Sequence, residues 1–583
     1  MLEAHPTWGE EAGAARIILK PLSDADAARV VDSLLGEVGL AEDARTRIVG
    51  ASEGNPLFVE QLLSMLIEGG RLRRDEAGWT ATTDLSELAI PPTIHALLAA
   101  RLDALPAAER AIIEPASVIG LAFPGPAVEA LVPDTLRREI EIHLGALTRK
   151  QLVRVLEDQT DEDQIYRFHH LLIRDAAYQG LLKRSRALLH ERFVAWADVV
   201  NEERGRVTEF EEILGYHLEQ AYRYRTELGP LDDHGVTLGI RAAERLASAG
   251  TRAMARGDMP AAASLLGRAA AVLPVDHPTR PWLLIRTAEA RFEIGEIGAA
   301  GLLADEATEV ASSIGDAALE ATARIERLRV RYTTEAAGSD AQVAAQVRDL
   351  MAVLDAAGGE AGLARAWRLM FQIHAAATQW GEAEAAATKV LAHARVSGDH
   401  LMEIRVPPAL AEIALSGPTP VAEALERCKQ LLLEVKGDRR AEALILRATA
   451  HLRAMQGDFQ PAREIYRGVR QTLEELGWNF QAALVSLDSG PIEMLAGDAA
   501  AAEAELRLDY EMLERMGDRN YISTTAAFLA EALLRLGRDI DASEMAAFAE
   551  TEAAPDDLLT QFLWRGTRGK LLARAGRFEE GAV

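Results

Sequence analysis

The string GASEG, Gly50 to Gly54, has the residue order of a catalytic motif. It fits the nucleophile elbow G-x-S-x-G, in which a tight strand-to-helix turn exposes a serine hydroxyl for attack on an acyl group. A polar helical segment, rather than a strand, precedes Ser52, and no Asp and His partners can be placed beside it. The string therefore does not support a serine hydrolase.

Metal and redox chemistry find equally little support. Cys428 is the single cysteine, and the string HERF, His190 to Phe193, stands alone without HExxH or CxxC spacing. Zinc sites need several such ligands at fixed spacings. One cysteine also excludes an internal disulfide, which fits a reducing cytoplasm. We expect no metal site.

The loop that holds nucleotide phosphates is missing from the 583 residues. A GxxxxGK[ST] loop supplies clustered backbone N–H groups and a lysine for the phosphate charges. The nearest string, GTRGKLL at Gly566 to Leu572, has the wrong spacing. No strand-borne acidic residue for magnesium can be placed either. We therefore expect no ATP hydrolysis by this chain.

The stretch SEGNPLFVEQLLSML, Ser52 to Leu66, joins a tight turn directly to an apolar helix. Asn55 is a good N-cap, and Pro56 stands at the first helical position, where its missing N–H costs nothing. Phe58, Leu62, Met65 and Leu66 then line one helical face, and Gly69 with Gly70 ends the helix. Local chemistry alone thus predicts a well-formed helix start.

The elements around this turn can also be placed. A short strand, Arg16 to Leu19, precedes a helix capped by Ser23, and a second helix spans Glu42 to Ser52. Further on, Pro92 and Pro106 begin two helices, and a third covers Pro133 to Arg149. The segments QLVRVLED and QIYRFHH then read as strands around the acidic turn QTDED. Three helices with a two-stranded wing form a winged-helix pattern.

The C-terminal residues contain a repeat of about 40 residues. Its first mark is a recurring glycine: Gly257, Gly295, Gly338, Gly381, Gly417, Gly457, Gly497, Gly537 and Gly576. Its second mark is an alanine five residues later, at Ala262, Ala300, Ala386, Ala422, Ala462, Ala502 and Ala542. Val343 and Gly581 are the exceptions.

This spacing predicts helical hairpins. Glycine ends the first helix in a left-handed conformation, and a small residue lets the second helix approach the first. In LRAMQGDFQPAREIYRGV we expect Leu452 and Met455 to supply the stripe of the first helix, and Ala462, Ile465 and Tyr466 to face it. Stacked hairpins bury both faces and form a solenoid with a concave surface for proteins or peptides.

These units resemble long, degenerate tetratricopeptide repeats. The strings GNPLFVEQLL, IPPTIHALLAARLDAL, YRFHHLLIRDAAYQGLL and RALLHERF, in this order, resemble the lid and winged-helix parts of STAND-type signalling ATPases. Those are relatives of the NB-ARC switches, and the resemblance is to bacterial forms fused to class III adenylate/guanylate cyclases or LuxR-type regulators. The opening LEAHPTWGE resembles the segment after the sensor-1 strand of that family.

The resemblance implies two nucleotide contacts. Gly54, Asn55 and Pro56 occupy the family's Gly-x-Pro motif, whose proline packs on the adenine ring. His170 matches the histidine that contacts the β-phosphate of ADP, and His169 is a weaker candidate. The alternative for His170 is that it only caps the wing, and for Arg174 with Asp175 that they form a surface pair. ATP or ADP would belong to the parent protein, and we expect no tight binding by this chain.

The resulting expectation is a mainly α fold: a small helical lid and a winged-helix domain, followed by an α-solenoid of tetratricopeptide-like hairpins. The expected boundaries are 1–89 for a remnant of the ATPase core with the lid, 90–190 for the winged helix, 191–240 for a helical linker and 241–583 for the solenoid. The missing phosphate loop and a last unit that stops within its second helix, at ARAGRFEEGAV, predict a piece of a larger protein.

Composition limits the partners. The net charge of −27 disfavours nucleic acid, because binding to phosphate backbones needs a basic surface. The basic run Arg167 to Arg192 is interpreted as a solvated helix face or a contact with acidic parts of the chain. No run of about 18 apolar residues and no signal peptide occur, so a cytoplasmic protein without membrane partners is expected.

Two functions fit these observations. In the first, the chain is the regulatory and protein-interaction portion of a nucleotide-controlled switch, whose repeats sense a partner or ligand and whose ATPase core lies upstream. In the second, it is a stand-alone, non-enzymatic scaffold, with the N-terminal part as a folded cap on the solenoid. Both predict protein or peptide partners for the solenoid and no catalytic residues in this chain.

Overall fold

The computed structural model describes residues 19–36, 40, 42–75, 78–82, 91, 93–156, 163–334, 340–555 and 557–581. The chain divides into two compact units, residues 1–207 with 220–231 and residues 208–219 with 232–583. Most of the predicted strand Arg16 to Leu19, and also Pro92, lie outside the described residues. Leu19 is described; it lies in no strand, and its side chain is exposed.

Three helices and a hairpin begin the first unit: α1 (Asp24–Leu35), α2 (Glu42–Ser52), α3 (Pro56–Glu68), β1 (Leu72–Asp75) and β2 (Gly78–Ala81). The Ser23 hydroxyl accepts a hydrogen bond from the Asp26 N–H at 3.2 Å, which confirms the predicted cap. Phe58, Leu62 and Leu66 of α3 are buried as predicted, whereas Met65 is half-buried. Helix α3 ends before Gly69, also as predicted.

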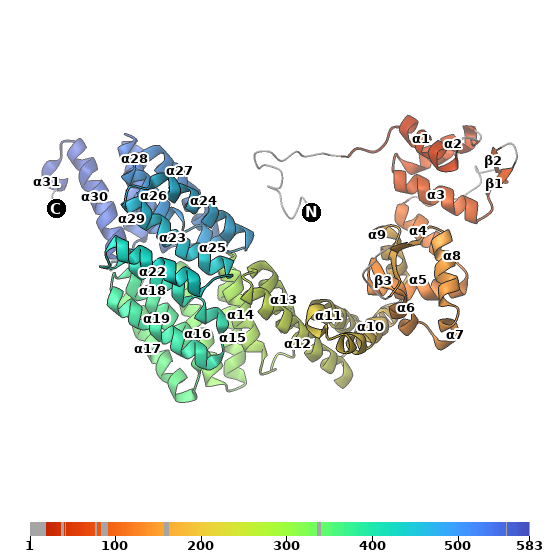
Figure 1. The fold of residues 1–583 in the computed structure, drawn as a ribbon, viewed down its shortest axis with the longest axis horizontal. Coiled ribbons are helices and arrows are strands. Elements are labelled where there is room, and N and C mark those ends of the chain that lie inside the picture. Colours follow the sequence, from red (N-terminus) through yellow and green to blue (C-terminus); the bar gives the residue numbers. More distant parts are fainter. Residues whose placement is uncertain are drawn as a thin grey trace. The chain divides into compact units, whose positions relative to one another are not determined.

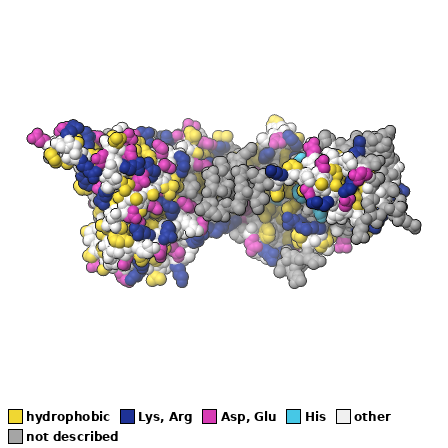
Figure 2. Space-filling model, turned by 90° about the horizontal axis from the view of Figure 1, so that it is seen from above, with side chains coloured by type: hydrophobic (Ala, Val, Ile, Leu, Met, Phe, Trp, Pro, Cys, Tyr) yellow, Lys and Arg dark blue, Asp and Glu magenta, His cyan; other side chains and the backbone are white. Residues whose placement is uncertain are grey.

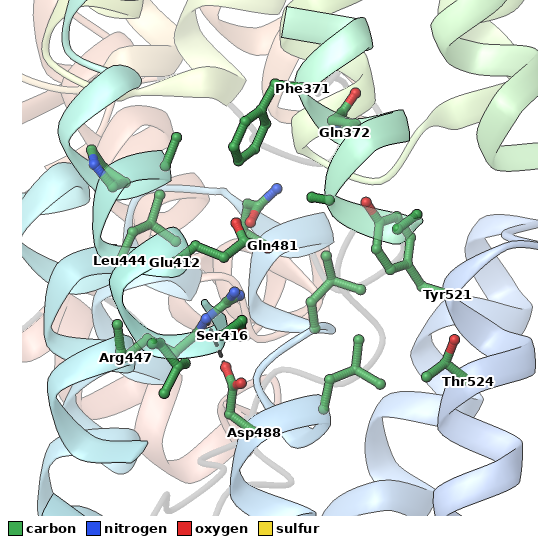
Figure 3. A pocket seen from close by; sticks show the side chains of 18 of the residues that line it. Phe371, Gln372, Glu412, Ser416, Leu444, Arg447, Gln481, Asp488, Tyr521 and Thr524 are labelled. Carbon is green, nitrogen blue, oxygen red and sulfur yellow. Dashed lines mark ion pairs between the residues drawn. The ribbon is translucent and has the colours of Figure 1, made fainter. Parts of the chain in front are cut away.

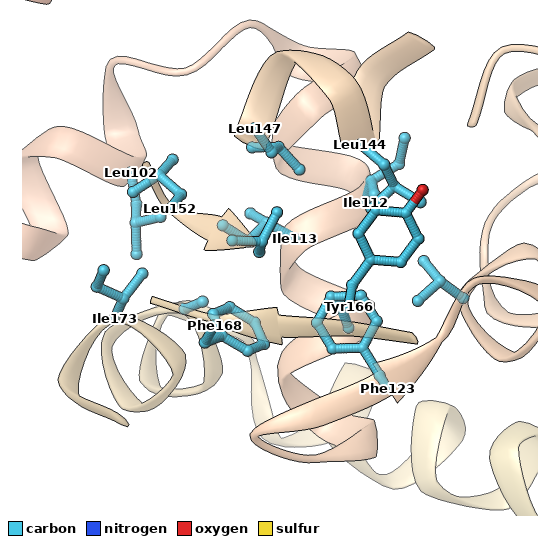
Figure 4. Close-up of a cluster of buried hydrophobic side chains, with 14 of the residues drawn as sticks. Leu102, Ile112, Ile113, Phe123, Leu144, Leu147, Leu152, Tyr166, Phe168 and Ile173 are labelled. Atoms are coloured by element: carbon cyan, nitrogen blue, oxygen red, sulfur yellow. The ribbon is translucent and has the colours of Figure 1, made fainter. Parts of the chain in front are cut away.

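A mixed layer of helices and strands follows: α4 (Ile94–Asp103), α5 (Ala107–Ile119), β3 (Ala122–Pro124), α6 (Gly125–Leu131), α7 (Asp134–Arg137), α8 (Ile140–Arg149), β4 (Val153–Leu156), β5 (Ile165–Phe168) and α9 (Leu171–Gly180). The strands pair antiparallel in the order β3-β5-β4. Their core is shown in Figure 4, where the Phe123 ring lies between Tyr166 and Phe168, with ring centroids 6.0 and 5.4 Å away.

Two predictions for this layer need correction. The hairpin β4–β5 is present, but β3 adds a third strand that the sequence reading missed, because three residues ending at Pro124 carry no visible alternation. The single helix predicted over Pro133 to Arg149 is broken into α7 and α8. Helix α7 buries no residue, whereas Ile140, Leu144 and Leu147 of α8 are buried, so the chain turns at 138–139 to place α8 in the core.

Helices continue from there through the second unit. The first of them are α10 (Lys183–Glu203), a 3-10 turn (Val207–Phe210) and α11 (Glu211–Leu228). The helical hairpins then follow in chain order, coloured from olive to blue in Figure 1: α12 (Asp233–Ala255) with α13 (Met259–Val272), α14 (Arg280–Glu293) with α15 (Ile297–Ser313), α16 (Ala317–Thr334) with α17 (Asp340–Ala357), α18 (Glu360–Ala376) with α19 (Trp380–Ser397), α21 (Val406–Ser416) with α22 (Val421–Glu434), α23 (Arg439–Met455) with α24 (Phe459–Glu475), α26 (Ser486–Leu495) with α27 (Ala499–Met516), α28 (Tyr521–Arg535) with α29 (Asp539–Glu552), and α30 (Leu558–Arg574) with α31 (Phe578–Gly581). Short helices α20 (His400–Glu403) and α25 (Asn479–Ala482) precede two of the pairs. The predicted α-solenoid is confirmed.

The glycine turns are confirmed at six of the nine predicted positions. Gly257, Gly295, Gly457, Gly497, Gly537 and Gly576 all have a positive φ between paired helices. Gly338 lies outside the described residues. Gly381 lies inside α19, and the turn before this helix is made by Thr378 at φ 56°. Gly417 has φ −82°. The repeat is irregular at these two hairpins because the connection is shifted relative to the glycine.

The alanine signal follows the helix start rather than the glycine. The fourth residue of seven second helices is a buried alanine: Ala262, Ala300, Ala383, Ala424, Ala462, Ala502 and Ala542. The short α31 has Gly581 at this position. The predicted Ala422 is wrong, because α22 starts two residues later than the repeat implies and leaves Ala422 exposed. Met455 is also wrong as a core residue, since it is 51% exposed.

The solenoid winds far enough for distant hairpins to meet. The Trp478 indole Nε1–H donates to the Gly257 carbonyl oxygen at 2.7 Å, across 221 residues of sequence. The Asn479 amide donates to the Ile294 carbonyl oxygen at 3.2 Å, and the Arg519 N–H donates to the Thr333 carbonyl oxygen at 2.8 Å. The Phe292 and Phe480 rings pack edge to face at 4.7 Å. These contacts close the inner surface of the solenoid.

Candidate functional site

Gly54 is fixed by the backbone of the first unit. It has φ +75°, and its carbonyl oxygen accepts a hydrogen bond from the Leu22 N–H at 2.8 Å. A Cβ at this position would lie 2.3 Å from the Leu22 carbonyl oxygen. Only glycine fits such an approach without movement of the backbone. Packing of the two segments therefore accounts for Gly54.

Asn55 and Pro56 form the start of α3 as predicted. The Asn55 Oδ1 accepts hydrogen bonds from the N–H groups of Leu57, at 3.0 Å, and Phe58, at 3.3 Å. Pro56 occupies the first helical position, and both Asn55 and Pro56 are exposed. An exposed proline face is available to a flat ring, although capping alone explains the residues.

His170 is the N-cap of α9. Its Nδ1 accepts a hydrogen bond from the Leu172 N–H at 3.1 Å, so His170 caps a helix rather than the wing that the alternative named. His169 lies beside α3, with its Nδ1 3.9 Å from the Glu60 carboxylate. Arg174 pairs with Asp175 at 3.1 Å and also donates to the Ser117 carbonyl oxygen at 2.8 Å, which ties α9 to α5. Each predicted nucleotide residue thus has a local structural role.

A different site stands out in the second unit. A cavity of about 650 Å³ lies inside the solenoid, lined by residues of α18, α21, α23, α26 and α28. Figure 3 shows its middle, where Glu412 and Gln481 lie between Phe371 and the Arg447–Asp488 pair, with Tyr521 on another wall. Its volume lies within the range of about 300–1,000 Å³ that is usual for ligand sites.

Buried ion pairs underlie one wall of this cavity. Arg365 of α18 donates to both carboxylate oxygens of Glu289 in α14, at 2.8 and 3.2 Å, and pairs with Asp399 at 3.0 Å. Arg286 also pairs with Asp399, at 3.2 Å, and Arg329 pairs with Glu326. The guanidinium of Arg365 stacks on Trp282 at 4.7 Å. In these pairs the charges balance.

Three arginines nearer the cavity have fewer carboxylates. Arg368 and Arg405 share one oxygen of Glu293, at 3.4 and 3.0 Å. Arg440 lies over the Trp478 ring at 4.6 Å and is 3.9 Å from Asp438. Burial and the neighbouring charges of Arg405 and Arg329 lower the pKa of Arg368 to about 9. Burial and Arg405 lower the pKa of Arg440 to about 10.

Acidic groups line another wall. Arg447 of α23 pairs with Asp488 of α26 at 2.8 Å, and His451 lies 3.5 Å from the same carboxylate. Burial raises the pKa of Glu412. Burial also raises the pKa of Tyr521, which lines the cavity beside these groups. The cavity therefore has a basic end formed by the three arginines, a paired Arg447–Asp488 group with Glu412 elsewhere in its lining, and apolar surface.

Of the lining residues, the sequence points to Met455, and to that residue as part of a helix stripe rather than of a site. The only signal is helical spacing of charge, such as Arg286, Glu289 and Glu293 on one helix and Arg365 with Arg368 on another. On the face of the second unit seen in Figure 2, basic and acidic side chains are interspersed in the same way. A charged stripe of this kind normally faces water, so the sequence alone could not distinguish the buried stripe from a solvated one.

The described part of the chain contains neither a metal-ligand cluster nor a helix that could span a membrane. In the described ranges, no three His, Cys, Asp or Glu side chains gather as they would around a metal ion. None of the helices that the structure describes is long and apolar enough to cross a membrane.

No protein-family model matches the chain. In an alignment of 326 residues that covers 52% of the chain, it is 28% identical to an uncharacterized protein of Rhizobium meliloti (strain 1021). The chain spans 28% of the length of that relative.

Several solved structures share helical repeats with it at low similarity. One is a STAND protein with a tetratricopeptide-repeat sensor from Pyrococcus horikoshii, at 12% identity and a TM-score of 0.35 over 98% of this chain and 72% of that one. Another is a Rap protein complexed with Competence and Sporulation Factor, at 12% identity and a TM-score of 0.36 over 62% of this chain and 99% of that one. A third is aspartyl phosphate phosphatase F of Bacillus subtilis, at 14% identity and a TM-score of 0.33, covering 66% and 96%.

Proposed function

We propose that this chain is the sensing and protein-interaction portion of a nucleotide-controlled signalling switch, and that the solenoid cavity binds the ligand it senses. The observation that carries the proposal is the cavity of about 650 Å³, which the inner helices of consecutive hairpins line together. A ligand there contacts several hairpins at once. Its binding can therefore change how the hairpins are stacked, which is how a solenoid transmits a signal.

The lining favours a short peptide as the ligand. Gln372, Gln481 and Asn520 place carboxamides on three walls, and each carboxamide offers both donors and acceptors to a peptide main chain. The Gln372 Oε1 is buried and has no hydrogen-bond partner among the described residues. Phe371, Leu444 and other apolar side chains provide surface for the side chains of the peptide.

The first unit would connect this sensor to the ATPase core of the switch. That role rests on the resemblance of its GNP turn and FHH strings to the STAND family. The same resemblance is the basis for proposing an output domain of the cyclase or LuxR type in the parent protein. Without a phosphate loop, a nucleotide would have two contacts in this unit: the exposed Pro56 for its adenine ring and the imidazole of the capping His170 for a phosphate. We therefore propose that the chain alone binds ATP and ADP only weakly.

A peptide selection tests the sensing role. The full chain is used to select from a random heptapeptide library, and the selected peptides are titrated calorimetrically against three forms of the protein. Gln372→Trp fills the cavity from α18. Gln471→Trp makes the same change on the exposed surface of α24 and is the control. We expect the first to weaken binding at least tenfold and the second to leave it unchanged.

Peptides that bind wild type and Gln372→Trp equally would show that the cavity is not the binding site and would favour the stand-alone scaffold. A parallel titration with fluorescent ADP addresses the other half of the proposal. We expect no low-micromolar binding. Tight binding that Pro56→Ala and His170→Ala abolish would contradict the proposed weak contact and show a working nucleotide site in this chain.

A further inference from the structure

The basic end of the cavity carries more positive charge than its own carboxylates balance. Arg368, Arg405 and Arg440 line the cavity together with Trp478. The carboxylates that face them are those of Glu293, shared by two of the arginines, and of Asp438, 3.9 Å from the third. Three cations therefore share two anions, in a chain whose net charge is −27.

The positions of these groups direct the excess charge into the cavity. Glu293 is 1% exposed and is not among the lining residues, so it lies behind the arginines rather than between them and the cavity. Asp438 does not line the cavity either. The guanidinium groups are thus the first charges that a ligand meets at this end.

Unused donors point to the same conclusion. In the part of the chain that the structure describes, Arg440 Nη2 and Arg405 Nε are buried without a hydrogen-bond partner. The Arg440 side chain is only 3% exposed. A buried charged donor without a partner is costly, and an acceptor bound in the cavity would remove this cost. Burial, and after it the like charge of Arg405, lowers the pKa of both Arg368 and Arg440.

We propose that Arg368, Arg405 and Arg440 bind a carboxylate of the ligand against the face of Trp478. This inference rests on the proposed function, because the ligand is the peptide in the same cavity. One carboxylate added to Glu293 and Asp438 equals the charge of the three arginines. Guanidinium groups match carboxylates in shape and hydrogen-bond them in pairs.

A doubly charged phosphate fits this end less well. The Oε2 atom of Glu293 is buried and, within the described ranges, has no hydrogen-bond donor, so it repels additional negative charge. Elsewhere in the lining, Arg447 is already paired with Asp488 at 2.8 Å, so it offers an anion no unbalanced positive charge. The carboxylate is therefore either the C-terminal group of the peptide or an Asp or Glu side chain, placed at the arginine end.

The experiment uses pools of random hexapeptides with three terminal chemistries. One pool ends in a free carboxyl group, one in a carboxamide and one in a phosphoserine amide. Peptides retained by the full chain are identified by mass spectrometry. We expect enrichment of the carboxyl pool, or of Asp and Glu at a fixed position in the carboxamide pool, and at least tenfold weaker binding of those peptides to Arg440→Met.

Arg439→Met is the matched control, because Arg439 is the neighbouring residue on α23 and its side chain is 57% exposed beside Glu475. It should bind the peptides as wild type does. The melting temperature of the free protein checks the fold independently. Since Arg440 is crowded by Arg405, Arg440→Met should melt at or above the wild-type temperature, and a large decrease would contradict the unbalanced charge.

The outcomes separate the two proposals. Suppose that neutral peptides bind wild type and Arg440→Met equally but do not bind Gln372→Trp. That result would overturn the proposed carboxylate contact and leave the sensing cavity supported. Preference for the phosphoserine pool would also overturn it. Failure of every pool to bind would count against the sensing cavity itself.

Discussion

Arg365 of α18 and Glu289 of α14 form a fully buried, two-point ion pair across 76 residues of sequence, with the two side chains 2% and 1% exposed. Asp399 and Arg286 extend the pair into a balanced group of four charges. This group lies behind the cavity wall that carries Arg368. It fixes the inner helices of distant hairpins relative to one another.

Arg365→Met should therefore destabilise the second unit strongly. The substitution leaves Glu289 buried without its main partner, and such losses cost about 3–5 kcal/mol. Arg568→Met removes an arginine of similar size whose pair with Glu550 is about half exposed, and it should change stability by less than about 1 kcal/mol. Chemical denaturation of the two variants compares them. Equal losses of unfolding free energy in the two variants would show that the buried pair stabilises the protein no more than the exposed pair does.

Gly54→Ala should open the first unit locally. The new methyl group would meet the Leu22 carbonyl oxygen at a residue with φ +75°, which costs roughly 1–3 kcal/mol or more. Gly50→Ala is the control, since Gly50 is exposed within α2 and has free space around it. Alanine should stabilise that helix by about 0.5–1 kcal/mol. Hydrogen exchange of the α1, α2 and α3 amides measures both effects. Protection that is unchanged in Gly54→Ala would refute the packing explanation.

Two alanines of α22 test how the hairpins pack. Ala424, at the fourth helical position, is buried, whereas Ala422 is exposed. Ala424→Leu should lower stability by about 1–3 kcal/mol through overpacking, and Ala422→Leu should be nearly neutral. Thermal unfolding of both variants shows whether the buried alanine is set by its distance from the helix start or by its distance from the preceding glycine. If the distance from the glycine decided the packing, Ala422→Leu would lower stability more than Ala424→Leu.

Asp518 gives the second unit a defined pH dependence. It is 1% exposed, and burial raises its pKa to about 8 although the Ile522 N–H donates to it at 2.7 Å. The folded state therefore keeps a proton that the unfolded state releases near pH 4. Stability should fall as the pH rises from about 4 to about 8, by about 1 kcal/mol per pH unit, and should level off above that range.

Asp518→Asn should remove this slope, because asparagine keeps the acceptor for Ile522 without a charge. Asp498→Asn is the control: it caps α27 from an exposed turn and should retain the wild-type slope. The free energy of unfolding is measured at pH 5 and pH 8 for each protein. Identical slopes in Asp518→Asn and wild type would exclude Asp518 as the source.

The sequence was sufficient where local chemistry decides the structure. Asn55 and Pro56 predict the start of α3 by themselves, and glycine turns predict the hairpins. The glycine pattern is denser than the sequence reading recognised. Turns between hairpins also use glycine, so positive φ recurs every 20 residues at Gly437, Gly457, Gly477, Gly497, Gly517 and Gly537. Where Thr378 replaces glycine at the turn, the prediction failed.

The cavity could not be predicted because it depends on contacts between distant residues. Arg368 lies in α18, Arg440 in α23 and Arg405 in the turn before α21, and each by itself resembles a solvated arginine. The arginines become a cluster only when Trp478 meets Gly257 and the inner surface closes. No periodicity in the sequence encodes that closure, whereas His170 matched a family motif and serves as a helix cap in this chain.

Hydrogen exchange of the full chain, with and without the best-binding carboxyl-terminated peptide, tests the central claim most directly. If the cavity binds the peptide, amides of α18, α21, α23 and α25, which carry or flank the arginines and Trp478, should gain protection, and those of the outer helices α22 and α24 should not. The same peptide should protect none of these segments in Gln372→Trp. Protection confined to the outer helices, or to the first unit, would contradict a ligand site inside the solenoid.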